Sequence, residues 1–89
     1  MQFGSIILTM NKEKVLIITM EECGELTRAC SKILRHGYVQ QKHINNLKEE
    51  LGDVVAMTRL VQELYDIDDD TLEFHVWKRK LKMKSAEYK

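Results

Sequence analysis

Four acidic side chains occur as two pairs, and the members of each pair are three positions apart in the sequence. Glu22 and Glu25 form the first pair, and Glu50 and Asp53 form the second. Residues at i and i+3 meet on one face of a helix, and both pairs fall on positions that continue an apolar helical stripe. A carboxylate buried without a partner is unfavourable, and two neighbouring carboxylates repel each other. The pattern therefore requires a ligand or partner that offsets this cost.

A divalent cation suits such a set of carboxylates. Oxygen-only clusters bind Mg²⁺ or Mn²⁺, which prefer carboxylates and water in octahedral geometry. The alternative is a set of structural salt bridges, in which the same acids pair with Arg28, Lys32 or Lys48. Two acid pairs on two stripes favour the metal over the salt bridges.

A glycine lies inside each acid pair, Gly24 in the first and Gly52 in the second. A glycine in the middle of a helix costs about 1 kcal/mol relative to alanine. We therefore expect another backbone or a bulky ligand to approach closely at both positions. Ordinary packing of helices through small residues is the alternative, and it would also bring the two acid pairs together.

Helices are predicted to position these acids. The first helix runs from about Lys12 to His36, with Asn11 as its N-cap and Gly37 as a left-handed residue just past its end. Its apolar positions follow helical spacing: Val15, Ile18, Leu26, Ala29 and Ile33.

A connector over residues 38–43 leads to a second helix, expected from about Ile44 to Tyr65. Its apolar stripe comprises Ile44, Leu47, Leu51, Val54, Val61 and Leu64. An aspartate-rich break follows, and Asp70 with Glu73 resembles a capping box that begins a third helix. The third helix is expected to end at about Ala86.

The composition favours one all-α domain. The chain has 89 residues, no proline and 44% apolar residues, which favours long helices and argues against disorder. We expect a single domain over residues 1–89, with residues 1–10 as a short N-terminal extension. Two long helices with a short loop form an antiparallel hairpin, and a single further helix leaves apolar surface uncovered. Homo-oligomerisation, into a homodimer or homotetramer, would complete a four-helix-type bundle.

Charge and cysteine content narrow the functional class. The 14 Lys and Arg residues balance 14 Asp and Glu residues, which argues against a nucleic-acid-binding module. No run reaches the ~20 apolar residues of a membrane span, and the N-terminus does not fit a signal peptide. We therefore expect a cytoplasmic protein. Cys23 and Cys30 are expected to be buried thiols, and the three histidines are expected on the surface or in loops.

Two blocks carry a resemblance to a known family: EECGEL over residues 21–26 and EELGDV over residues 49–54. Together they resemble the EExxE…ExxD signature of the MazG-like all-α nucleoside triphosphate pyrophosphohydrolases, over about residues 12–86. The resemblance implies hydrolysis of a nucleoside triphosphate, standard or modified, to the monophosphate and pyrophosphate. It also implies a requirement for Mg²⁺, with Mn²⁺ as a substitute.

The resemblance also implies roles for individual residues. Those implied as metal ligands are Glu22, Glu25, Glu50 and Asp53. Those implied as catalytic, to orient the attacking water or accept its proton, are Glu21, Glu22 and Glu49. On the third helix, Lys78 and Lys82 are candidates to bind phosphates, with Arg28 and Lys32 as further candidates on the first helix. A solvated basic face is the alternative for the lysines, and Trp77 is expected in the core.

A second hypothesis competes with the enzyme. Relatives commonly have an additional helical segment before the helix that carries the first acid block, where this sequence has about ten residues. This favours a helical assembly or regulatory module that keeps the scaffold without turnover, whereas the intact set of four acids favours the enzyme. A calcium loop over Asp66–Asp70 is disfavoured because Thr71 occupies the position that requires glycine, so helix capping explains these aspartates better.

Overall fold

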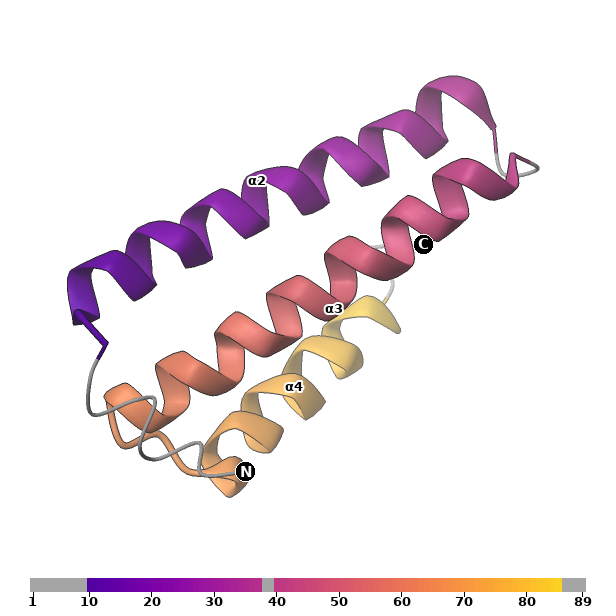
Figure 1. Cartoon of the computed structure of the whole chain (residues 1–89). Helices are drawn as coiled ribbons and strands as arrows, with labels where there is room; N and C mark the ends of the chain where they lie inside the picture. The colour runs from indigo at the N-terminus through magenta and orange to yellow at the C-terminus, as the bar shows by residue number, and fades with distance from the viewer. Residues whose placement is uncertain (1–9, 38–39, 86–89) are drawn as a thin grey trace.

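The computed structural model describes residues 10–37 and 40–85, which form three α-helices and no strand. Helix α2 spans Lys12–His36, α3 spans Gln41–Leu64 and α4 spans Asp69–Met83. Helices α2 and α3 form an antiparallel hairpin, and α4 turns back to lie on the side of α3 that faces away from α2 (Figure 1). The prediction of an all-α chain with three helices is confirmed.

Both predicted ends of α2 are confirmed, and capping explains them. The Asn11 side chain accepts a hydrogen bond from the backbone N–H of Lys14 at 3.2 Å, which satisfies one free amide of the first turn. At the other end, the backbone N–H of Gly37 donates to the carbonyl of Ile33 at 2.8 Å. Gly37 has φ of 89° and ψ of 168°, so it adopts an extended conformation with positive φ rather than the expected left-handed helical one. That region is open essentially to glycine alone.

Helix α3 begins three residues earlier than predicted, at Gln41 rather than Ile44. The N-cap residue, Gln40, makes no capping hydrogen bond through its side chain. Instead, the side-chain amide of Gln41 donates to the side chain of Asn45 one turn later, at 2.9 Å. Because residues 40–43 include no glycine or proline, nothing local prevents the helix from extending to this point.

The predicted capping box of the third helix is wrong. The N-cap of α4 is Asp68, whose carboxylate accepts a hydrogen bond from the backbone N–H of Thr71 at 2.6 Å. Asp70 lies inside the first turn beside Asp69, where the helix dipole stabilises both charges. The left-handed backbone of Asp66, with φ of 56°, reverses the chain just before this cap. The expected end at Ala86 lies outside the described residues, and α4 ends at Met83.

The core between α2 and α3 is small. The fully buried apolar residues of the described chain are Val15, Ala29 and Ile33, all on α2 and all on its predicted stripe. On α3, Leu51 is 46% exposed, so its placement on the core stripe is wrong. Pairs of Cα atoms within 8 Å join α2 to α3 but, in the part of the chain that is described, do not join α4 to either helix.

Several side chains expected inside are exposed. Helix α4 presents Phe74, Trp77 and Leu81 on one face, each more than half exposed, so the expectation of a core Trp77 is wrong for a single chain. Cys23 and Cys30 are exposed free thiols rather than buried ones. None of the described helices is long and apolar enough to cross a membrane.

Candidate metal centre

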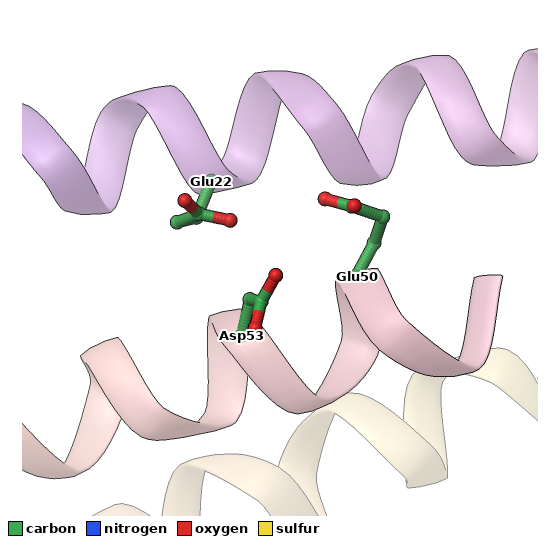
Figure 2. Close-up of side chains that lie close together, drawn as sticks. All are labelled: Glu22, Glu50 and Asp53. Carbon is green, nitrogen blue, oxygen red and sulfur yellow. The ribbon is translucent and has the colours of Figure 1, made fainter. Parts of the chain in front are cut away.

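Three of the four predicted metal ligands converge in the space between the hairpin helices. Glu22 points from α2 towards α3, while Glu50 and Asp53 point from α3 towards α2 (Figure 2). One carboxylate oxygen from each residue lies within 4.8 Å of the other two. The i, i+3 spacing of Glu50 and Asp53 puts them on one face of α3, and the antiparallel packing brings Glu22 opposite them. We call these three residues the acid trio.

The fourth predicted ligand, Glu25, lies outside the trio. Its carboxylate accepts a hydrogen bond and forms a salt bridge with the exposed guanidinium of Arg28, one turn along α2. The salt-bridge alternative considered from the sequence is therefore realised for this one acid. Glu25 still acts on the trio, because its charge contributes to raising the pKa values of both Glu22 and Glu50.

Electrostatics in the trio favour an added positive charge. Partial burial raises the pKa of Glu50, and the charges of Asp53, Glu25 and Glu22 raise it further. Partial burial also raises the pKa of Glu22, together with the charge of Asp53 and a hydrogen bond between the two side chains. The Oε2 atom of Glu50 is buried and has no hydrogen-bond partner. A buried acceptor left unpaired is costly, and a divalent cation would satisfy it, so these residues fit a hard metal ion.

The remaining predicted site residues lie outside the trio. Glu21 and Glu49 are exposed neighbours of the trio, and their charges contribute to raising the pKa values of Glu22 and Glu50, respectively. The ammonium group of Lys78 lies 5.5 Å from the centroid of the Phe74 ring. Lys82 is exposed on α4, and Lys32 is half-buried on α2. No interaction described for residues 10–37 and 40–85 joins Arg28, Lys32, Lys78 or Lys82 to the trio.

The expected close approach at the two glycines is not found among residues 10–37 and 40–85. A Cβ atom built on Gly24 or on Gly52 would have no neighbouring atom within 4 Å. Both residues are exposed, and each lies next in sequence to a residue with an exposed side chain, Cys23 beside Gly24 and Leu51 beside Gly52. Neither glycine is therefore required by contacts within a single chain.

Sequence reasoning missed a contact at the turn of the hairpin. The rings of His36 and His43 stack with their centroids 5.0 Å apart and their planes inclined by 15°. His36 is the last residue of α2 and His43 lies in the first turn of α3, so the antiparallel hairpin brings the two rings together. All three histidines are helical; His36 and His75 are exposed, as expected of surface residues, and His43 is half-buried. The concentration of basic residues around the turn was the signal in the sequence that pointed to this region.

Comparison with known proteins assigns the chain to a family. A family model described as the MazG nucleotide pyrophosphohydrolase domain matches residues 10–76. No curated protein and no solved structure matches the chain. The matched range includes both acid blocks, both helices of the hairpin and the first half of α4, which is well over half of the chain. The chain therefore belongs to the MazG nucleotide pyrophosphohydrolase domain family.

Proposed function

We propose that this chain hydrolyses a nucleoside triphosphate to the monophosphate and pyrophosphate, and that the reaction requires Mg²⁺. The observation that carries the proposal is the buried, unpartnered oxygen of Glu50, which faces the carboxylates of Glu22 and Asp53. Family membership supports a nucleotide pyrophosphohydrolase in general. The metal, the triphosphate substrate and turnover by this particular chain are the proposed part.

In this proposal the acid trio binds the metal, with Glu25 as a fourth ligand. Glu25 would join by rotating its carboxylate away from Arg28, which is an inexpensive change because the salt bridge is exposed. Bound Mg²⁺ neutralises phosphate oxygens and lowers the pKa of a bound water. Mn²⁺ accepts the same oxygen ligands and is a possible substitute.

The chain's own acids would then handle the proton of the attacking water. Glu21 and Glu49 adjoin the trio and are exposed to solvent, so either can orient a water or accept its proton as a general base. Glu22 has a raised pKa and a hydrogen bond with Asp53, and metal binding requires the deprotonated carboxylate. Metal affinity is therefore expected to fall as pH falls.

We assign the binding of the substrate's phosphate groups to basic side chains. Arg28 and Lys32 lie on α2, the helix that provides Glu22. Lys78 and Lys82 lie on α4, which runs along the other side of α3 from α2 (Figure 1). The α4 lysines would therefore serve the metal centre of a second copy of the chain.

The assignment of the α4 lysines requires self-association, as a homodimer or homotetramer. Two hairpins packed together would form a four-helix-type bundle, and such packing would place a neighbouring backbone against Gly24 or Gly52. The exposed face of Phe74, Trp77 and Leu81 supports this assembly, because large apolar side chains clustered on one helix face mark interaction surfaces.

Pyrophosphate release from a panel of standard and modified ribo- and deoxyribonucleoside triphosphates tests the proposal. We expect release from at least one of them with Mg²⁺ and none with a chelator. The control is a circular dichroism spectrum that shows a helical, folded sample. If a folded sample releases no pyrophosphate from any member of the panel, the enzyme is refuted. The competing hypothesis, a helical assembly or regulatory module, is then favoured.

A further inference from the structure

The turn of the hairpin gathers positive charge from both helices. From Leu26 to Lys48 the chain contains no aspartate or glutamate. The same stretch includes five Lys or Arg residues and two histidines: Arg28, Lys32, Arg35, His36, Lys42, His43 and Lys48. The stack of His36 on His43 joins the two halves of the stretch across the turn. We call Lys32, Arg35, His36, Lys42 and His43 the hairpin cluster.

The charges of the hairpin cluster repel one another. Partial burial lowers the pKa of His43, and the charges of His36, Lys42, Lys32 and Arg35 lower it further, so all four groups lie near this imidazole. The salt bridge found among the described residues joins Arg28 to Glu25, outside the cluster. Lys32, Arg35 and Lys42 have no acidic partner within the described ranges. An anion bound here would relieve the repulsion.

The N-terminus of α3 adds to the positive electrostatic potential of the hairpin cluster. The N-cap residue Gln40 makes no capping bond, and the first turn contains no acidic residue. Lys42 and His43 occupy that turn instead, at the positive end of the helix dipole, where cations are unfavourable. The first amide N–H groups of a helix have no partner within the helix and can donate to an anion. Side chains and backbone therefore present donors and positive charge to the same region.

We propose that the hairpin cluster is a binding site for phosphate groups, separate from the acid trio. His43 precedes Glu50 by seven residues and Lys32 follows Glu25 by seven, so each lies two helical turns, or about 10 Å, from the acid. A seven-residue step also keeps both residues on nearly the same side of their helices as the acids. The ligand is an oligophosphate, which is either the phosphate chain of the substrate or a free anion such as pyrophosphate. Lys32 is the one member of the cluster that the proposed function already assigns to the substrate's phosphates. The cluster as a whole needs neither a metal nor turnover, so it goes beyond the proposed function.

Binding of inorganic pyrophosphate to the metal-free chain, measured by calorimetry with a chelator present, tests the site. We expect the double variant Lys32→Gln/Lys42→Gln to bind about tenfold more weakly, because each exposed ion pair contributes up to about a fivefold effect. Lys32→Arg/Lys42→Arg should retain binding. The matched control is Lys12→Gln/Lys14→Gln, which removes the same charge about 30 Å away along α2 by helix rise. This control should bind as the native chain does.

Proton NMR of the imidazoles gives a second readout. Pyrophosphate should raise the pKa of His43, because an anion offsets the charges that lower it. Two results overturn the proposal: a folded native chain that binds no pyrophosphate, or equal weakening in the lysine double variant and its control. Folding of each variant is checked by circular dichroism.

Two further measurements distinguish the source of the phosphate and keep this site apart from the proposed function. If Lys32→Gln/Lys42→Gln raises KM for a triphosphate without changing kcat, the cluster binds the substrate itself. If KM is unchanged and pyrophosphate binding is still weakened, the ligand is a separate anion. Glu50→Gln should bind pyrophosphate normally with chelator present. A chain that binds pyrophosphate at the cluster but hydrolyses no nucleotide would refute the proposed function and leave this site standing.

Discussion

Replacing Glu50 by glutamine should stabilise the metal-free protein. The change keeps the size of the side chain and removes one of three carboxylates whose oxygens lie within 4.8 Å of one another. That separation is shorter than the Debye length of about 8 Å at physiological salt, so solvent ions do not screen the repulsion. We expect the unfolding temperature of metal-free Glu50→Gln at pH 7 to exceed that of the native chain by roughly a few degrees.

The direction of the pH dependence follows from the raised pKa of Glu50. Between the ordinary value of 4.5 and the raised value, the native state binds more protons than the unfolded state. The free energy of unfolding therefore falls as pH rises through this window. Glutamine does not titrate, so the advantage of Glu50→Gln should be largest at pH 7 and should shrink as pH falls to about 4.5. Comparison of the two chains at each pH removes the contributions of groups that do not interact with Glu50.

Mg²⁺ should reverse the order of stability. A ligand that binds only the folded state stabilises it in proportion to the logarithm of its concentration over Kd. Loss of even an outer partner of a metal ligand costs about 10- to 100-fold in affinity, so loss of a direct ligand should cost at least as much. With saturating Mg²⁺, the native chain should therefore unfold at a higher temperature than Glu50→Gln, and the variant should have lost turnover.

Scanning calorimetry at several pH values, with and without Mg²⁺, measures both effects, and Mn²⁺ electron paramagnetic resonance measures metal affinity directly. The matched control is Glu63→Gln, which removes an exposed charge from the same helix outside the trio. Metal-free Glu50→Gln that is less stable than the native chain at pH 7 would refute the electrostatic reasoning. Equal stabilisation of both chains by Mg²⁺ would refute the ligand assignment.

Other predictions concern the hairpin turn, the helix cap and the assembly. Because the pKa of His43 is lowered from 6.5, its contribution to the free energy of unfolding should rise with pH through the window below 6.5, opposite in sign to the contribution of Glu50. In urea unfolding, His43→Gln should make the slope of the unfolding free energy against pH less positive than in the native chain, and a more positive slope would contradict the assignment. Asn11→Ala should cost about 1 kcal/mol of stability through loss of the cap, and Asn11→Ser should recover most of it. Light scattering should show a native dimer or tetramer, and Trp77→Lys should shift it towards monomer with its helical spectrum intact. A native chain that is monomeric at micromolar concentration would refute the assembly.

Features set by neighbouring residues were predictable from the sequence. Asn11 accepts a hydrogen bond from an amide three residues away, and its type and position alone predict the cap. The i, i+3 spacing of Glu50 and Asp53 fixes their shared face, and the antiparallel hairpin brings Glu22 opposite them. The local rules therefore predicted the bounds of α2 and most of the acid trio.

Features that depend on competition between equivalent residues were not predictable. Three consecutive aspartates can each cap a helix, and the left-handed turn at Asp66 selected Asp68. Glu25 can pair with Arg28 or turn towards the trio, and it forms the salt bridge with Arg28. Trp77 fits an apolar stripe, but the pattern does not distinguish packing within the same chain from packing against another chain. The core of a single hairpin is too small to cover it.

The hairpin cluster gives one end of a chain of zero net charge a local excess of positive charge. The basic cluster lies where α3 begins, and an acidic group that includes Glu63, Asp66, Asp68 and Asp69 lies where α3 ends. The 24 residues of α3 separate the basic cluster from the acidic group by about 36 Å. The dipole of α3 has its positive end at the basic cluster and its negative end at the acidic group, so it adds to the separation of charge. An approaching polyphosphate is drawn to one end of the molecule and a divalent cation to the other. Despite a pI of about 6.8, the protein should therefore bind both anion- and cation-exchange resins near neutral pH.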